Sequence, residues 1–117
     1  MIAKLSTVVL DTPDPHTLAR FYAELLGLRI TKVDSDWIDV GDESGRVLSF
    51  QLAPNHIPPQ WPDPNYPQQL HLDIRVDDID AAESTALRMG AQLLATPEAG
   101  YRVYSDPAGH PFCLEHD

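Results

Sequence analysis

Residues 70–90, LHLDIRVDDIDAAESTALRMG, contain the pattern that decides the fold. Over the first seven of them, aliphatic side chains alternate with polar ones, which is typical of a β-strand with one buried face. Asp78 is a favoured N-cap for the helical stretch that follows, and Gly90 is a common stop signal at its end. The stretch therefore predicts a strand over 70–76 and a helix over 79–89.

The first half of the chain repeats this order of elements at an offset of 64 residues. Asp14 corresponds to Asp78 as an N-cap, and Gly27 follows the amphipathic stretch after it. Near the ends of the two halves the offset becomes 62, which aligns Gln51 with Cys113. The expected strands cover residues 5–10, 28–33, 35–40, 46–52, 70–76, 92–95, 101–105 and 111–115. The repeat predicts two βαβββ modules, each with a helix on one face of its sheet.

Residues 54–69 lie between the two modules and contain six of the chain's 11 prolines, so a regular helix or a central strand is unfavourable there. The stretch is a bare connector or a loop that covers another surface. Trp61 and Tyr66 give it apolar side chains to bury, which favours a docked crossover. We expect one domain over residues 1–117. Its parts are module 1 (1–53), the Pro-rich crossover (54–69) and module 2 (70–117).

Acidic residues outnumber basic ones by 18 to 8, and the formal net charge is −10. Such a charge repels nucleic acid and anionic membrane surfaces, so neither is an expected partner. No apolar run approaches the roughly 20 residues needed to cross a bilayer, and residues 1–11 lack the apolar core of a signal peptide. The single cysteine, Cys113, cannot form an internal disulfide. A cytoplasmic location is the expectation.

Three segments carry a family resemblance that covers nearly the whole chain: residues 9–28, 71–91 and 106–114. They include VLDTPDP, ARFY and LLGL in the first, HLDIRVDD and LRMGA in the second, and DPAGHPFCL in the third. Through them the chain resembles the vicinal oxygen chelate superfamily, which includes glyoxalase I, extradiol dioxygenases and bleomycin-resistance proteins. The resemblance implies an α+β fold in which two tandem βαβββ modules form a cup-shaped mixed β-sheet barrel with helices on the outside. It also implies a homodimer.

The resemblance further implies where a metal would bind, because metal-dependent relatives take one ligand from the first and one from the last strand of each module. The corresponding positions in this chain are Thr7, Gln51, His71 and Cys113. Only His71 matches the family's residue types, since threonine is a poor ligand, glutamine is neutral and cysteine is soft. Asp73 and Glu115 are placed to substitute. A complete metal site is therefore not expected, and the weak metal candidates are His71, Gln51 and Glu115.

Polar and aromatic side chains predict a ligand cavity on the face of the sheet that carries His71. Arg75 shares that face and is a candidate contact for an anionic group. Two simpler interpretations stay open, because the same alternation is typical of a solvent-facing strand and aromatic residues also close small cores. Cys113, between two apolar neighbours, also fits a small buried hydrophobe. The candidate ligand-binding residues are Thr7, Trp37, Gln51, Trp61, Tyr66, His71, Asp73, Arg75, Tyr101 and Cys113.

The function that the resemblance implies is that of a glyoxalase/bleomycin-resistance-like protein. Such a protein would bind a small organic ligand, aromatic or natural-product-like, in the sheet cavity without a complete metal site. The alternative is a metal-dependent lyase, isomerase or dioxygenase acting on a vicinal-oxygen substrate, with a divalent metal as its cofactor. A third class, a non-enzymatic interaction module, predicts an exposed apolar patch and no enclosed pocket. Whether the chain is an enzyme stays open at this point.

Overall fold

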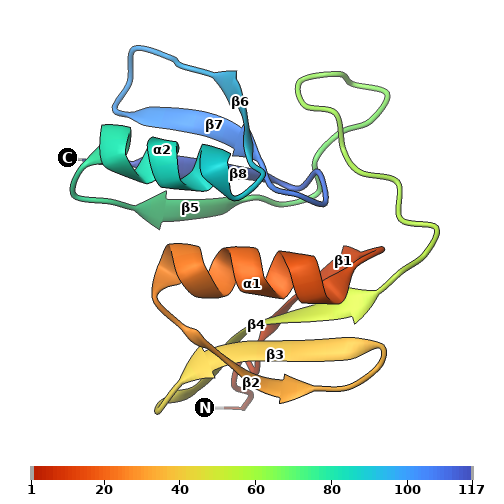
Figure 1. The fold of residues 1–117 in the computed structure, drawn as a ribbon. Helices are drawn as coiled ribbons and strands as arrows, with labels where there is room; N and C mark the ends of the chain where they lie inside the picture. Colours follow the sequence, from red (N-terminus) through yellow and green to blue (C-terminus); the bar gives the residue numbers. More distant parts are fainter. Residues whose placement is uncertain (1, 117) are drawn as a thin grey trace. The chain divides into compact units, whose positions relative to one another are not determined.

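The computed structural model describes residues 2–116. The contacts within the chain divide it into two units, Met1–His56 and Ile57–Asp117. Each unit contains one α-helix and one four-stranded mixed sheet (Figure 1). The Pro-rich residues from 57 onward therefore belong with the second unit.

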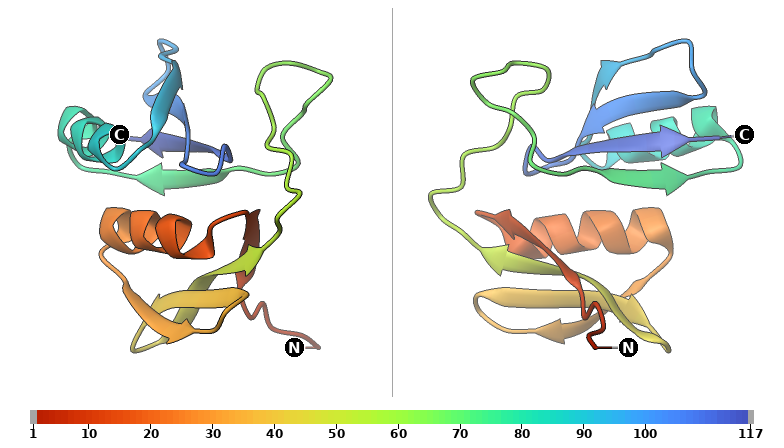
Figure 2. Two further views of the ribbon diagram at one scale, coloured as in Figure 1. Left: turned by 45° about the vertical axis from the view of Figure 1, so that its right-hand side comes forward. Right: turned by 180° about the vertical axis from the view of Figure 1, so that it is seen from behind.

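The first unit has the order of elements that its sequence predicts. Its elements are β1 (Val8–Thr12), α1 (Pro15–Leu26), β2 (Arg29–Val33), β3 (Trp37–Asp42) and β4 (Gly45–Leu52). The sheet has the order β1-β4-β3-β2, in which β1 is parallel to β4 and the other pairs are antiparallel. Helix α1 packs on the sheet of its own unit, as the two views of Figure 2 also show.

The second unit repeats this topology. Its elements are β5 (Leu72–Arg75), α2 (Ile79–Arg88), β6 (Gln92–Ala95), β7 (Tyr101–Ser105) and β8 (Pro111–Glu115). The sheet has the order β5-β8-β7-β6, with β5 parallel to β8. The predicted α+β class and the two tandem βαβββ modules are thus confirmed.

The expected closed barrel is not formed. Closure would require an outer strand of one sheet to pair with an outer strand of the other. Over residues 2–116 the strands instead pair within their own unit and form two separate four-stranded sheets. Neither α1 nor α2 has the length and apolar character that a membrane-spanning helix needs.

Helix α1 begins and ends where its capping residues predict. The Asp14 carboxylate accepts hydrogen bonds from the Thr17 backbone N–H at 3.2 Å and from the Thr17 hydroxyl at 2.6 Å. Pro15 occupies the first helical position, where its missing N–H is not needed. Gly27 ends the helix in the left-handed conformation, at φ 65°.

Replacing Asp14 by alanine should lower the free energy of unfolding by about 1 kcal/mol, because the backbone N–H and the hydroxyl of Thr17 lose their acceptor. Asp14→Asn should recover most of the loss, and Glu24→Ala, an exposed change within α1, should have little effect. The hydrogen bonds from Thr17 lower the pKa of Asp14. The contribution of the Asp14 cap to the free energy of unfolding should therefore be present at neutral pH and decline as pH falls below about 4. Urea denaturation measured at several pH values checks both expectations.

The core of the first unit lies between α1 and one face of its sheet. The buried helix residues Leu18, Ala19, Phe21 and Tyr22 face the buried strand residues Leu10, Ile38, Val40, Leu48 and Phe50. Tyr22 stacks on Phe50 with ring centroids 5.9 Å apart. The side chains between these positions along each strand point to the opposite face of the sheet.

The second unit has a comparable core with an added polar bridge. Tyr104 stacks on Phe112 at 5.3 Å, and both side chains are fully buried. The Tyr104 hydroxyl donates to Glu83 at 2.9 Å, and Arg102 donates to Glu83 and to Asp80. Burial and the Glu83 carboxylate raise the pKa of Tyr104, so its phenol stays protonated and the bridge persists at neutral pH. These side chains join β7 to α2 and leave the opposite sheet face free for other contacts.

The Pro-rich segment packs against the turn that precedes β8. Asp106 orders this turn by accepting hydrogen bonds from the backbone N–H groups of Ala108 and His110 at 2.9 and 3.0 Å. Gly109 adopts φ +90° there, and a Cβ atom at this position would lie 2.5 Å from Cβ of Pro58. Such a close approach requires glycine. The segment is therefore a docked loop on the second unit.

Candidate functional site

The second unit contains a pocket of about 280 Å³ on the face of its sheet opposite α2. The residues that line it are Trp61, Gln68, His71, Asp73, Tyr101, Val103, Pro111, Cys113 and Glu115. This volume lies just below the usual range for small-molecule sites, which is roughly 300–1,000 Å³. The pocket therefore suits a compact ligand.

Strand register explains why these side chains meet. On the parallel pair β5–β8, Asp73 lies opposite Cys113. On the antiparallel pair β7–β8, Val103 lies opposite Cys113 and Tyr101 opposite Glu115. Alternate residues of a strand share one face, so all five side chains point to the side of the sheet that α2 leaves open.

The polar end of the pocket is formed by an imidazole beside carboxylates. Nε2 of His71 lies 3.2 Å from Oδ1 of Asp73, and both side chains are partly exposed. Glu115 is held by Arg75, whose Nη2 lies 3.5 Å from the Glu115 Oε1. Arg75 therefore lies next to the pocket and is paired with a carboxylate, while His71 and Asp73 present polar atoms to the pocket itself.

The Cys113 thiol is a buried group of the pocket. Its pKa is raised to about 11, chiefly by burial and further by the Asp73 carboxylate, as a neighbouring charge and hydrogen-bond partner, and by the charge of Glu115. A thiol with this pKa is protonated at neutral pH. In this environment Cys113 fits the predicted small buried hydrophobe, and a role as nucleophile is disfavoured.

The aromatic candidates separate into two groups. Trp61 and Tyr101 line the pocket and form apolar walls for it. Tyr66 belongs to the same Pro-rich loop as Trp61, but its side chain is 43% exposed and lies outside the pocket lining. Trp37 belongs to the first unit, where its indole N–H donates to Asp39.

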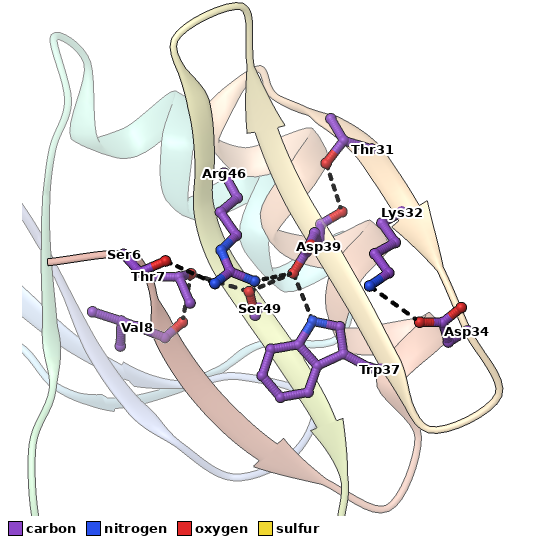
Figure 3. Close-up of polar contacts among 10 residues, drawn as sticks. All are labelled: Ser6, Thr7, Val8, Thr31, Lys32, Asp34, Trp37, Asp39, Arg46 and Ser49. Atoms are coloured by element: carbon purple, nitrogen blue, oxygen red, sulfur yellow. Dashed lines mark hydrogen bonds and ion pairs between the residues drawn. The ribbon is translucent and has the colours of Figure 1, made fainter.

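The corresponding face of the first unit is occupied by an internal polar network (Figure 3). One carboxylate oxygen of the buried Asp39 accepts hydrogen bonds from Trp37 Nε1 at 2.7 Å and from Ser49 Oγ at 2.6 Å. Arg46 approaches the same oxygen at 3.5 Å. The Thr7 hydroxyl lies 3.1 Å from the Ser49 hydroxyl. These groups satisfy one another, and we call them the Asp39 network.

Strands β1, β3 and β4 match β5, β7 and β8 at an offset of 64 residues, which corrects the shift of 62 expected near the ends of the units. Val8 pairs with Leu48 as Leu72 pairs with Phe112, and Trp37 pairs with Gln51 as Tyr101 pairs with Glu115. All of these pairs are related by 64 residues. Similar local sequences, Phe50-Gln51-Leu52 and Phe112-Cys113-Leu114, had suggested the shorter offset. Gln51 therefore corresponds to Glu115, and Cys113 corresponds to Ser49.

The residues do not reproduce the metal set of metal-dependent relatives. The offset of 64 for the first and last strands makes the four family-type positions Thr7, Gln51, His71 and Glu115. Of these, only His71 and Glu115 are side chains that commonly hold a divalent ion. The Thr7 hydroxyl already lies within hydrogen-bond distance of Ser49, and Gln51 offers a neutral oxygen where a carboxylate is expected. A four-ligand site of that kind does not fit this chain.

The structure thus brings together a subset of the predicted site residues, namely Trp61, His71, Asp73, Tyr101, Cys113 and Glu115. It adds three pocket residues that the sequence did not single out, namely Gln68, Val103 and Pro111. Val103 was identifiable in principle, because it follows Tyr101 by two residues on a predicted strand. Gln68 lies in an irregular loop and gave no pattern to follow.

This fold and pocket define a glyoxalase-like class of protein, and comparison with known proteins agrees. Residues 7–115 match the family model of the glyoxalase-like domain. The chain therefore belongs to the glyoxalase-like domain family, consistent with the vicinal oxygen chelate superfamily that its sequence resembles. A comparison with curated proteins gave no match.

Solved structures with the same fold include several glyoxalase relatives. A glyoxalase/bleomycin resistance protein/dioxygenase family enzyme from Burkholderia phytofirmans PsJN has a TM-score of 0.75 and 20% identity, over 97% of this chain and 98% of that one. A glyoxalase-related enzyme from Fulvimarina pelagi has a TM-score of 0.71 and 20% identity, over 99% of this chain and 89% of that one. The fosfomycin resistance protein FosX from Listeria monocytogenes has a TM-score of 0.73 and 13% identity, over 100% of this chain and 95% of that one. At these identities the similarity establishes the fold alone.

Proposed function

We propose that this protein binds a small organic ligand, aromatic or natural-product-like, in the pocket of its second unit. The observation that supports this most directly is the lining of the pocket. Two aromatic side chains, Trp61 and Tyr101, face it together with a few polar groups at one end, which is the usual composition of a small-molecule site.

The charges of the pocket indicate which ligand groups it would favour. Asp73 and Glu115 contribute two carboxylates, and Arg75 lies close enough to offset that of Glu115. His71 lies within 3.2 Å of Asp73 and can hold that carboxylate in place. The remaining acceptors favour a ligand with hydroxyl or amine donors over a strongly anionic one.

Replacing Trp61 by alanine should weaken ligand binding about 10- to 100-fold, because a large aromatic wall of the pocket is lost. A thermal-shift screen with aromatic natural products would identify a stabilising compound, and isothermal titration would then measure its Kd. Tyr66→Ala is the matched control, since Tyr66 lies in the same loop but outside the pocket, and it should change Kd less than about twofold. Equal effects of the two variants, or no stabilising compound, would count against the proposal.

A second candidate is a metal-dependent lyase, isomerase or dioxygenase acting on a vicinal-oxygen substrate. It is favoured by one observation, that His71 and Glu115 occupy the two family-type positions of the second unit and face the same pocket. A divalent ion there would supply Lewis-acid chemistry to substrate oxygens. Metal analysis of protein purified without chelators, followed by activity assays with added Mn²⁺, Ni²⁺, Fe²⁺ and Zn²⁺, would test this candidate. An absence of both stoichiometric metal and metal-dependent turnover would eliminate it.

We further propose a cytoplasmic homodimer that binds neither nucleic acid nor membranes. The family resemblance supports the dimer, and the net charge of −10 supports the absence of polyanionic partners. Size-exclusion chromatography with light scattering would test the dimer directly. A monomeric mass over a range of protein concentrations would reject it.

A further inference from the structure

The pocket of the second unit contains three metal-ligating side chains of different chemistry. Nitrogen, oxygen and sulfur atoms of His71, Asp73 and Cys113 all lie within 4.8 Å of one another. Asp73 and Cys113 belong to the sheet of the second unit, and His71 immediately precedes β5. Asp73 and Cys113 are register partners on β5 and β8, and His71 precedes Asp73 by two residues on the same face.

These donors are suited to a borderline transition-metal ion. Imidazole, carboxylate and thiolate are each ligands of Zn²⁺, whereas Mg²⁺ and Ca²⁺ prefer oxygen ligands alone. Metal–ligand distances of about 2.0–2.3 Å in a tetrahedral site place ligand atoms about 3.5 Å apart. The distance of 3.2 Å between His71 Nε2 and Asp73 Oδ1 already fits this requirement.

Small side-chain rotations are enough to complete the set. Cys113 is buried and fixed in the sheet, while the side chains of His71 and Asp73 are 39% and 54% exposed and can turn toward it. Three protein ligands leave one coordination position for water or for a donor atom of a ligand, as in catalytic zinc sites. Glu115 lies at the same pocket but has Arg75 as its partner at 3.5 Å.

We propose that the second unit binds a Zn²⁺-type ion through His71, Asp73 and Cys113. This donor set differs from the four-residue family pattern, because all three ligands come from the second unit and include a thiolate. On binding, the Cys113 thiol releases its proton to solvent and its sulfur coordinates the ion, with no change of oxidation state. The site does not depend on the organic ligand proposed above.

Titration of the metal-free full-length protein with Co²⁺ would test the site, since Co²⁺ replaces Zn²⁺ and is visible by absorption. The expected result is a near-ultraviolet thiolate-to-metal charge-transfer band, lost on addition of Zn²⁺. Zn²⁺ should also raise the Tm in proportion to its occupancy, whereas Mg²⁺ at the same concentration should not. The absence of both the band and the Zn²⁺ shift would overturn the proposal.

Substitutions of the three residues would show which side chains bind the ion. Cys113→Ser should abolish the charge-transfer band, and His71→Ala and Asp73→Ala should each weaken Co²⁺ binding at least tenfold. Because Cys113 is buried, the two exposed-residue variants keep the test valid if Cys113→Ser fails to fold. His16→Ala, a histidine on α1, is the matched control and should leave the titration unchanged. Co²⁺ affinity that survives Cys113→Ser but not Glu115→Gln, followed by the visible d–d absorption of the ion, would overturn the proposal in favour of the family-type position.

The metal and the organic ligand can be tested separately. Trp61→Ala should leave Co²⁺ affinity within about twofold, because Trp61 carries no ligating atom. If Trp61→Ala abolishes organic binding while Co²⁺ binding persists, both proposals stand. If Co²⁺ fails to bind while aromatic compounds still stabilise the protein, only the metal site is rejected.

Discussion

Replacing Phe50 by alanine should lower the free energy of unfolding by about 3–5 kcal/mol. The ring is fully buried at the centre of β4, where it stacks on Tyr22 and pairs in register with Leu10 and Ile38. Truncation removes its apolar contacts and leaves a cavity that the close-packed core fills only in part. Urea denaturation followed by circular dichroism would measure the change.

The neighbouring position provides the control for this prediction. Gln51 follows Phe50 on β4, points to the opposite face and is exposed. Gln51→Ala should change the free energy of unfolding by less than about 0.5 kcal/mol. If the two variants lost equal stability, the faces assigned to β4 would be wrong, because a slip of one residue exchanges the two sides of a strand.

The sequence predicts the fold well because its signals are local. Asp14 and Asp78 are N-caps followed by apolar residues at helical spacing, and the structure has a helix after each. The strands depend on short runs of β-branched and alternating residues. The repeat then doubles the evidence, since the same order of signals occurs twice. The expected and observed helices and strands differ only in where they begin and end; β5, for example, begins at Leu72 and not at residue 70.

The pocket is less predictable because it depends on how an irregular loop docks. Trp61 and Tyr66 are equally plausible wall residues in the sequence, and both are aromatic residues between prolines. The backbone N–H of Gln60 donates to the carbonyl of Tyr66 at 2.8 Å, and this hydrogen bond closes a small loop over residues 60–66. Trp61 then reaches the pocket, and Tyr66 is left exposed. No local pattern distinguishes these outcomes before the loop is placed on the turn at Gly109.

The burial of polar side chains on one face of the first unit's sheet is also not predictable from the sequence. Trp37 and Asp39 are two residues apart and share a face, but the sequence does not show that Asp39 would be buried. Its burial depends on Ser49 from β4, which lies ten residues away, and on Arg46. Thr7 and Trp37 are predicted ligand contacts, and in the structure both belong to the Asp39 network.

Replacing Asp39 by alanine should lower the free energy of unfolding by about 2–4 kcal/mol, the second largest effect expected. The buried carboxylate oxygen accepts two short hydrogen bonds, from Trp37 and Ser49, and lies near the Arg46 guanidinium. Hydrogen bonds to a charged group contribute about 1.5–3 kcal/mol each, and their loss leaves the buried Ser49 hydroxyl and the indole N–H with fewer partners. Chemical denaturation at pH 7 would measure the loss.

Asp34→Ala, in the turn between β2 and β3, is the matched control. Asp34 forms an exposed ion pair with Lys32 at 3.4 Å, visible beside the Asp39 network in Figure 3. Pairs of this kind contribute little, so the change should be below about 0.5 kcal/mol. If Asp39→Ala proved as mild as Asp34→Ala, the hydrogen bonds assigned to Asp39 would not exist in solution.

The pH dependence provides an independent check of the Asp39 network. Burial alone raises the pKa of Asp39, but the hydrogen bonds from Ser49 and Trp37 and the charge of Arg46 lower it by more, so the net pKa is below its ordinary value. A carboxyl with a depressed folded-state pKa binds more protons when unfolded, so its contribution is complete above about pH 4 and is lost as pH falls through the folded-state pKa. Asp39→Asn keeps the shape and removes the charge. The stability difference between wild type and Asp39→Asn should therefore be largest near pH 6 and narrow below pH 4, and a constant difference across this range would show that the charge contributes nothing.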